Sequence, residues 1–345
     1  MVANATLTGL GAALVAALLT RALIAIALRR SILAVPNDRS SHTVPTPTLG
    51  GVAIALPVLA WSAYRVGQDP LCWSVVFGGG ILATLGFVDD LRDLSARSRL
   101  PIQCVAVAVA LATVPLAVPL ALGPIAIEPK WLVAALDFLI ALWMVNLYNF
   151  MDGIDGIAAS QCVLFCAGVL LVGHPAAFMH EFLWVLLGSS AGFLWFNRAP
   201  ARIFMGDVGS GLLGLLVGVI ALTLDARRQM PLIASLILLA GFWFDATYTL
   251  CVRIATGQKF ASAHRSHLYQ RAARRFGHGR TTSMFVGFAV VWLMPLAWLG
   301  VNMPRWGLAW LVLAVLPLAA AAVAMRAGLR EKAGDKAANE AVEAQ

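Results

Sequence analysis

Charged residues are scarce in this chain of 345 residues: Asp, Glu, Lys and Arg together make up 12% of it, whereas apolar residues make up 60%. A soluble domain carries about 25% charged and roughly 45–50% apolar residues. The mean hydropathy of +0.83 agrees with a chain that has too little charge to cover a surface facing water. These deficits exclude secreted, disordered and nucleic-acid-binding proteins, and they favour an integral membrane protein.

Patterns that bind zinc or form disulfides are also missing. The pattern His-Glu-x-x-His is absent, which excludes that class of zinc protease. The cysteines show no metal-binding spacing, and we expect them to be small core residues and not disulfide partners. All five lie in or beside apolar runs: Cys72, Cys104, Cys162, Cys166 and Cys251.

Long apolar runs are what the sequence does contain. A spanning helix needs about 20 mostly apolar residues. Eleven runs of this kind, separated by charged residues and by Gly and Pro, are predicted to span a bilayer: 5–28, 49–66, 71–88, 101–122, 131–150, 156–173, 181–197, 209–225, 231–251, 283–302 and 305–326. The predicted fold class is all-α, a polytopic membrane protein. It would have one multi-span domain over residues 1–326 and a short, frayed polar tail over 327–345.

Basic residues indicate the orientation, because cytoplasmic loops carry an excess of Lys and Arg. With eleven spans and the N-terminus outside, 19 of the 25 basic residues fall on the inner side, five fall in outer loops and Arg21 lies within the first span. This asymmetry predicts an N-out, C-in topology. The net charge of +8 is then partly a matter of topology. The first run lacks a basic n-region, so we expect a retained helix and not a cleaved signal.

Acidic residues gather at the predicted cytoplasmic ends of the spans. Asp89 and Asp90 lie in GFVDDLRDLS, Asp152 and Asp155 lie in NLYNFMDGIDGIAAS, and Asp207 lies in IFMGDVGSG. Plain structural roles are the alternatives: a solvated helix end for the first pair, turns for DGIDG and an N-cap for Asp207. However, the spacing predicts that Asp152 and Asp155 share one helical face, where two like charges are unfavourable unless a cation or a proton intervenes.

A basic segment, HRSHLYQRAARR, lies on the same predicted side and carries His264, Arg265 and His267. Its alternative roles are simple solvation or contact with anionic lipid. Mg²⁺ prefers carboxylates plus phosphate oxygens, and phosphoryl transfer needs positioning and charge neutralisation. Carboxylates, histidines and arginines that meet at headgroup depth therefore predict a Mg²⁺-dependent phosphotransferase with a phospholipid-like acceptor. In the same way, the Gly-rich start of the span after Asp207 is predicted to offer backbone N–H groups to phosphate.

Five motifs, in this order, resemble those of the polyprenyl-phosphate N-acetylhexosamine-1-phosphate transferases, glycosyltransferase family 4: NDRSSHTVPTPTLGG, GFVDDLRDLSARSRLPIQ, NLYNFMDGIDGIAAS, FMGDVGSG and HRSHLYQRAARR. The resemblance runs from about Asp38 to Arg280, and HRSHLYQR looks most like the branch that initiates O-antigen, including the fucosamine-type transferases.

The resemblance implies an activity and a location. A UDP-N-acetylated sugar would give its sugar-1-phosphate to undecaprenyl phosphate, releasing UMP, as the initiating step of a surface polysaccharide. The protein would be a multi-pass protein of the bacterial inner membrane, with its active site on the cytoplasmic face. Which sugar is transferred, and whether the protein forms a homodimer, are left open.

The resemblance also implies roles for single residues. Mg²⁺, with Mn²⁺ as the alternative, is expected at Asp207 with Asp152 nearby. Asp89, supported by Asp90, is the candidate base for the lipid phosphate. The expected substrate contacts are Asn149 and Asp155 at the nucleotide, Phe204 on the uracil, His264 and His267 at phosphate or sugar, and Arg97, Arg99 and Arg265 at phosphate. Relatives commonly carry lysine in the region of Arg97 and Arg99, so charge is kept while the geometry of phosphate binding changes.

Rival functions fit parts of this pattern. A multi-span transporter or flippase would explain the spans but not the gathering of charge on one side. A CDP-alcohol phosphotransferase would carry Ala-Arg shortly after its first Asp-Gly, whereas Ile-Ala-Ala follows Gly156. Asp245 lies within a predicted span and has none of the roles above. We expect it to pair with a helix-end arginine such as Arg253, with a place in the lipid groove as the alternative.

Overall fold

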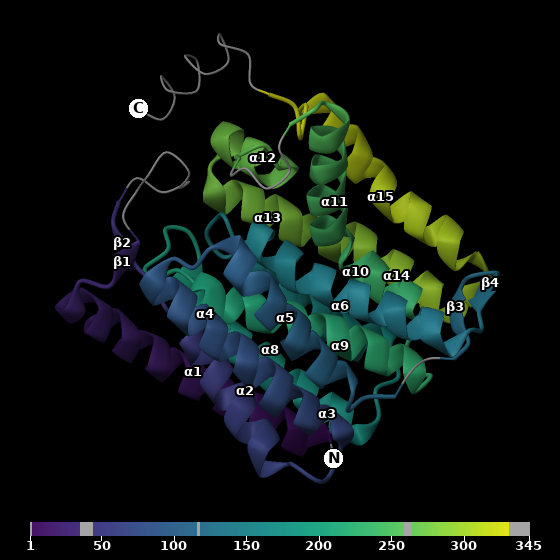
Figure 1. Cartoon of the computed structure of the whole chain (residues 1–345), viewed down its shortest axis with the longest axis horizontal. Helices are drawn as coiled ribbons and strands as arrows, with labels where there is room; N and C mark the ends of the chain where they lie inside the picture. Colours follow the sequence, from purple (N-terminus) through teal and green to yellow (C-terminus); the bar gives the residue numbers. More distant parts are fainter. Residues whose placement is uncertain (1, 35–43, 116–117, 259–263, 331–345) are drawn as a thin grey trace.

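The structure is a computed structural model that describes residues 2–34, 44–115, 118–258 and 264–330 (Figure 1). Residues 37–43 of the first motif therefore lie outside it. The described chain is almost entirely helical, which confirms the all-α fold class. The α-helices are α1 (Val2–Arg30), α2 (Val52–Tyr64), α3 (Pro70–Trp73), α4 (Gly80–Arg92), α5 (Ala96–Leu111), α6 (Lys130–Met151), α7 (Ile157–Val172), α8 (Ala177–Asn197), α9 (Gly206–Ala226), α10 (Leu232–Leu238), α11 (Ala240–Ala255), α12 (Leu268–Phe276), α13 (His278–Phe288), α14 (Met294–Asn302) and α15 (Gly307–Ala324).

Short irregular elements connect these helices. The π-helical turns Ser74–Gly79 and Ala289–Leu293 join α3 to α4 and α13 to α14, and a 3₁₀ turn precedes α15. Two small antiparallel pairs complete the described chain. Their strands are β1 (Leu33–Ala34) with β2 (Thr46–Pro47), and β3 (Leu120–Leu122) with β4 (Ile125–Ile127). Figure 1 shows the two pairs at opposite ends of the long helices.

Seven described segments are long and apolar enough to cross a membrane: Asn4–Arg30, Pro70–Arg92, Lys130–Met151, Ala177–Asn197, Gly206–Ala226, His278–Asn302 and Pro304–Ala324. The number is eight if the bent pair α10–α11 counts as one span, and each of these segments overlaps a predicted one. The chain is therefore a multi-pass membrane protein, but the predicted count of eleven is not confirmed.

Helix length is the reason for the difference. Helices α2 and α7 have 13 and 16 residues, and at about 1.5 Å per residue both are shorter than a hydrocarbon core of about 30 Å. Helix α5 ends at Leu111, and β3 takes up the end of the predicted span 101–122. The predicted span 231–251 is not straight, because α10 and α11 meet at 80°.

Helix α9 forms the centre of the bundle. In its most apolar stretch 89% of the residues are buried, against 22% in α1 and 17% in the segment of α15. Glycines let neighbouring helices approach it closely: a Cβ at Gly214 would lie 2.5 Å from the carbonyl oxygen of Met144 in α6. The start of α9 is consequently held from several sides, and this is the end at which the polar residues gather.

Helices α1 and α8 also pack through small residues. A Cβ added at Gly188 would overlap the carbonyl oxygen of Gly9, and one at Gly192 would overlap that of Ala13. Small residues at such contacts let two backbones approach, as is common between membrane helices. The lipid-facing α1 is thereby fixed to the bundle.

The first residues of the predicted tail are not frayed. Gly328 donates its backbone N–H to the carbonyl of Ser266 (2.8 Å), and its own carbonyl accepts from the Gln258 side chain (2.9 Å). The carbonyl of Leu329 accepts from Arg271 (2.6 Å). Residues 327–330 therefore pack on the region between α11 and α12, while the rest of the predicted tail lies outside the described residues.

We expect Gly188→Ala to lower stability by about 1–3 kcal/mol, because the added methyl group overpacks the contact between α1 and α8. Gly11→Ala is the matched control, since Gly11 is an exposed glycine of α1 with no atom near its missing Cβ. The melting temperatures of both variants and of the wild type are measured by thermal unfolding in detergent. Equal melting temperatures for the two would contradict the close packing.

Candidate active site

The start of α9 is capped by a side chain from another helix. Asp90, near the end of α4, accepts hydrogen bonds from the backbone N–H groups of Asp207 (2.8 Å) and Val208 (3.4 Å). A carboxylate at a helix N-terminus pairs with unsatisfied donors and with the positive end of the helix dipole. The expected N-cap role of Asp207 is therefore wrong, because Asp90 caps α9 and Asp207 lies in its first turn. These two N–H groups are also taken up by Asp90 and do not face an open phosphate site.

Two glycines make this contact possible. Gly206 has a φ of +71°, and a Cβ there would overlap the carboxylate of Asp90. A Cβ at Gly86 would overlap the backbone of Asp207 and Val208. The glycine before Asp207 in FMGDVGSG is thus required by backbone conformation and by the close approach of α4.

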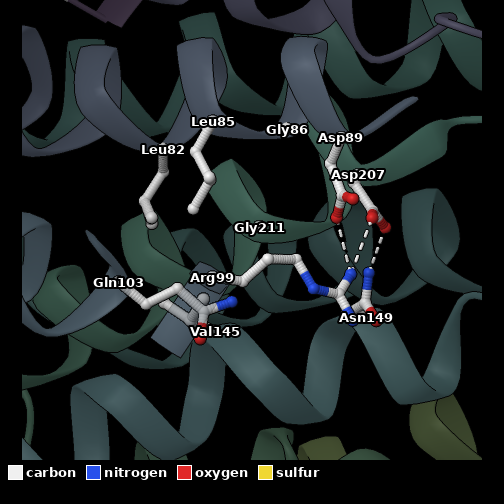
Figure 2. Close-up of a pocket in the computed structure, with 10 residues that line it drawn as sticks. All are labelled: Leu82, Leu85, Gly86, Asp89, Arg99, Gln103, Val145, Asn149, Asp207 and Gly211. Atoms are coloured by element: carbon white, nitrogen blue, oxygen red, sulfur yellow. Dashed lines mark hydrogen bonds and ion pairs between the residues drawn. The ribbon is translucent and has the colours of Figure 1, made fainter. Parts of the chain in front are cut away.

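Arg99 joins the two remaining acids of this cluster (Figure 2). Its Nη1 lies 2.6 Å from Oδ2 of Asp89 and 3.0 Å from Oδ2 of Asp207. Asp89 is buried, and its Oδ1 accepts from the backbone N–H of Leu94 (2.6 Å). Asn149, from the end of α6, donates to Oδ1 of Asp207. The structure therefore brings together four residues that the sequence had assigned to one site.

A small, partly open pocket lies beside this cluster, between α4, α5, α6 and α9. Figure 2 shows Asp89, Asp207 and Asn149 at one side of it, and Leu82 and Leu85 at the other side with Gln103. It is lined by Leu82, Leu85, Gly86, Asp89, Arg99, Gln103, Val145, Asn149, Asp207 and Gly211. The pocket therefore brings charged side chains and leucine side chains together at one site.

Asp152 is the acid next to this cluster. Helix α6 ends at Met151, and α7 begins only at Ile157. The prediction that Asp152 and Asp155 share a helical face is therefore wrong, because a turn separates them. Burial raises the pKa of Asp152 well above its ordinary value, and the negative charges of Asp207, Asp90 and Asp155 raise it further.

Asp155 points to a different set of partners. Its Oδ2 accepts from the backbone N–H of Ala201 (3.1 Å), and its Oδ1 lies 3.2 Å from Nδ1 of His278. Its carbonyl accepts from Thr282 (2.8 Å). Asp155 thus ties the loop before α9 to α13, and its expected contact with a nucleotide stays a prediction.

Three neighbours of these sites were missed from the sequence. His278 pairs with Asp155 across 123 positions. Asn197 accepts from the N–H of Gly156 (3.1 Å) and donates to the carbonyl of Ile203 (2.9 Å), so it closes the same loop. Gln103 lines the cavity. Only Gln103 carried a signal, because it ends the motif that contains Asp89.

The histidine segment is held by Asp245. This buried acid of α11 accepts from the backbone N–H groups of Leu268 (2.8 Å) and Tyr269 (2.9 Å), at the start of α12. Its Oδ1 also lies 3.5 Å from Nδ1 of His267. We expected Asp245 to have a structural partner within the fold, and it does. The partners that the structure describes are the start of α12 and His267, whereas we had expected Arg253.

His264 and His267 lie together, with ring centroids 4.9 Å apart. Burial, together with the nearby His267 and Arg253, lowers the pKa of His264 to about 4, so His264 is neutral at pH 7. Tyr269 donates its hydroxyl to the carbonyl of Phe150 (2.8 Å). The histidine pair is thereby attached to the chain that leads into Asp152.

The other expected substrate residues lie at the edges of this region. Phe204 is half-buried and precedes α9, where its backbone pairs with Pro47 (2.8 Å) and Gly50 (2.9 Å). Arg97 is exposed on the first turn of α5. The carbonyl of Arg265 accepts from Arg274 (2.9 Å). Their contacts with substrate stay predictions.

The donor set suits a divalent cation that also binds phosphate. Among the described residues, no group of three or more His, Cys, Asp or Glu is arranged to hold a metal ion. Mg²⁺, however, is commonly bound through one or two carboxylates plus substrate phosphates. Asp89 and Asp207 already share one cationic group, the guanidinium of Arg99, and so fit this requirement.

Fold and site together define a multi-pass membrane protein with a pocket lined by two acids and an arginine. The sequence model of glycosyl transferase family 4 matches residues 72–225, which include Asp89, Asn149 and Asp207. Over these residues the chain is similar to this family, and the similarity supports a place in the superfamily of polyprenyl-phosphate hexosamine-1-phosphate transferases.

Curated relatives agree with this placement. A probable undecaprenyl-phosphate N-acetylglucosaminyl 1-phosphate transferase of Bacillus subtilis is 29% identical over 253 residues, covering 71% of this chain and 70% of that protein. Phospho-N-acetylmuramoyl-pentapeptide-transferases of Chlamydia muridarum and Koribacter versatilis are each 31% identical, covering 56% of this chain. In both of the latter cases the alignment spans 65% of the relative, slightly less than two thirds of its length.

We expect Asp245→Asn to loosen the start of α12, because an amide cannot accept both backbone N–H groups through its two side-chain atoms. Leaving a buried donor unpaired costs about 1–3 kcal/mol. Hydrogen exchange of residues 268–276 should accelerate, and the melting temperature should fall.

Asp93→Asn is the matched control, since Asp93 is an exposed acid of the loop after α4. If Asp245→Asn left the exchange of 268–276 as slow as this control does, the anchoring role of Asp245 would be refuted.

Proposed function

We propose that the protein transfers a hexosamine-1-phosphate from a UDP-N-acetylated sugar to undecaprenyl phosphate. An oxygen of the lipid phosphate attacks the phosphorus that carries the sugar. The bond from that phosphorus to the UMP oxygen breaks, and UMP leaves with the electron pair. The products are undecaprenyl-diphosphate-sugar and UMP.

One observation carries this proposal: the Asp89–Arg99–Asp207 cluster forms one side of a pocket that has leucine side chains on its other side. A lipid phosphate has the same division between a charged head and a hydrocarbon chain. The names of the curated relatives supply the reaction class, since they include an undecaprenyl-phosphate sugar-1-phosphate transferase. A transporter would need polar groups along a path, whereas these acids gather at one end of the helices.

In this proposal Mg²⁺, or Mn²⁺ in its place, binds Asp207 and Asp89, with Asp152 nearby. The metal would neutralise the pyrophosphate of the nucleotide sugar, which is the main requirement of phosphoryl transfer. Asp90 does not need to touch substrate for this, because it holds the start of α9 and so places Asp207. Asn149 orients the Asp207 carboxylate from the other side.

The surroundings of Asp89 favour a role in positioning the acceptor phosphate over a role as a strong general base. A phosphate monoester has a second pKa near 6 and is largely dianionic at neutral pH, so it needs little deprotonation. Both oxygens of Asp89 are already hydrogen-bonded, one to Arg99 and one to Leu94. We assign Asp89 the task of keeping Arg99 and the acceptor phosphate in place, and of accepting the proton from the fraction of acceptor phosphate that still carries one.

The finer parts of the proposal concern location and pathway. The HRSHLYQR segment supports the initiating step of a surface polysaccharide, performed on the inner face of a bacterial cytoplasmic membrane. His264 is neutral at pH 7 and can accept or donate a hydrogen bond at the sugar or phosphate, and His267 lies against it. Phe204 and Asn149 are the proposed contacts of the uridine.

Purified protein, given undecaprenyl phosphate, Mg²⁺ and a panel of UDP-N-acetylated sugars, should release UMP with at least one of them. EDTA should stop the release. Asp207→Asn should lower it at least about a hundredfold, in line with removal of a group that stabilises transition-state charge, while the protein stays monodisperse in detergent.

Glu128→Gln is the control, because Glu128 is exposed beside β4, far from the start of α9. No UMP from any donor, with folded protein and with Mg²⁺ present, would refute the transferase function and leave transport of a lipid-linked solute as the alternative.

Asp89→Asn should impair the reaction more at pH 6 than at pH 8. At pH 6 about half of the acceptor phosphate carries a proton, and at pH 8 almost none does. The ratio of kcat/KM at the two pH values, variant against wild type, measures this. An equal loss at both pH values would show that Asp89 does not assist the protonated acceptor.

A further inference from the structure

We propose that Arg99 occupies the position of the metal cation in the metal-free protein, and that a divalent cation has to displace it. This inference rests on the metal site of the proposed function. It assigns Arg99 two successive partners: the acidic pair before the metal binds, and the substrate phosphate afterwards. Arg99 then opposes metal binding in the absence of substrate.

The geometry is that of a bridging cation. One nitrogen, Nη1 of Arg99, lies 2.6 Å from an oxygen of Asp89 and 3.0 Å from an oxygen of Asp207. The two acids come from different helices, α4 and α9, and their carboxylates lie side by side at the same end of the guanidinium (Figure 2). A cation that binds both carboxylates would need the same two oxygens.

Electrostatics explains why a cation is favoured between these two acids. The side chain of Asp89 is only 4% exposed, and Asp207 lies beside it as a second acid. Two like charges in a poorly solvated site repel each other unless a counter-charge intervenes. A dication and a guanidinium on the same oxygens would repel each other in turn. Binding of the metal and release of Arg99 are therefore coupled.

Arg99 is free to make this exchange. Its side chain is 30% exposed, and it extends from the first turn of α5, which Ser95 caps through the N–H of Ser98 (3.3 Å). Its release would not break that turn. A guanidinium displaced from the acids stays beside the same cavity, where it can bind phosphate oxygens through two parallel hydrogen bonds.

The chain offers a matched control two residues away. Arg97 belongs to the same turn of α5 and has the same charge, but it is exposed and does not line the cavity. Any effect of general surface charge on metal binding would appear in Arg97→Gln as well. An effect confined to Arg99→Gln would come from the contact with Asp89 and Asp207.

The test is a titration of the purified protein with Mn²⁺, read by the loss of the free-ion electron paramagnetic resonance signal, without lipid phosphate or nucleotide sugar. Arg99→Gln should bind Mn²⁺ about fivefold more tightly than wild type, because no ion pair has to be broken. Arg97→Gln should match wild type. Asp207→Asn, in either background, should abolish the tight site.

A second measurement follows Arg99 itself. Phenylglyoxal modifies exposed guanidinium groups, and mass spectrometry reports the extent at each arginine. Saturating Mg²⁺ should make Arg99 of the wild type react faster by at least about twofold, since it loses the partners that shield it. The rate of modification of Arg97 should be the same with and without Mg²⁺.

These measurements separate the two proposals. Unchanged or weaker Mn²⁺ binding by Arg99→Gln, or absence of any saturable site in that variant, would overturn the displacement of Arg99 even if UMP is released. Tighter binding by Arg99→Gln would support the displacement even if no UDP-sugar serves as donor.

Discussion

The carboxylate of Asp90 determines where α9 begins, and the rest of the candidate site depends on this contact. By accepting from the N–H groups of Asp207 and Val208, it joins the end of α4 to the most deeply buried helix of the bundle. This approach requires glycine at positions 86 and 206, because a Cβ atom at either position would overlap the facing residues. Once α9 starts there, Asp207 meets Arg99 from α5 and Asn149 from α6.

The crowding of acids at this end of the bundle is tolerated because each acid is compensated differently. Asp90 is balanced by helix amides and the helix dipole, and Asp89 and Asp207 are balanced by Arg99. Asp152 instead has a raised pKa, so it carries less charge near neutral pH than an ordinary carboxylate. Loop acids such as Asp155 are used to hold neighbouring segments together. Similar residues in one motif thus have unlike physical roles.

The sequence predicts the members of the site better than their arrangement. Asp89, Arg99, Asn149 and Asp207 could be assigned together because charge is rare in this chain and each lies at the end of an apolar run. Apolar composition does not determine whether a helix has the length to cross a bilayer, which is why the predicted count of eleven spans is not confirmed. Helical spacing assumes an unbroken helix, and this assumption fails at Asp152 and Asp155.

Contacts between distant parts of the chain account for the remaining differences. The pairing of His278 with Asp155 and that of Asn197 with Gly156 depend on how helices meet, which spacing along the chain does not reveal. Asp245 accepts from backbone N–H groups. Every residue except proline has such a group, so the partners of Asp245 could not be predicted from residue type. Capping of α9 by Asp90 could not be predicted for the same reason, and Asp207, which lies close to the start of the helix in sequence, was the N-cap candidate.

The packing of residues 327–330 against the start of α12 has a practical consequence for handling the protein. Gly328 and Leu329 contact Ser266 and Arg271, so the chain end and the histidine segment are mechanically linked. A purification tag or fluorescent fusion joined directly after α15 would pull on the segment that carries His264 and His267. Fusions are better placed beyond residue 330, where the hydrogen bonds of Gly328 and Leu329 are kept.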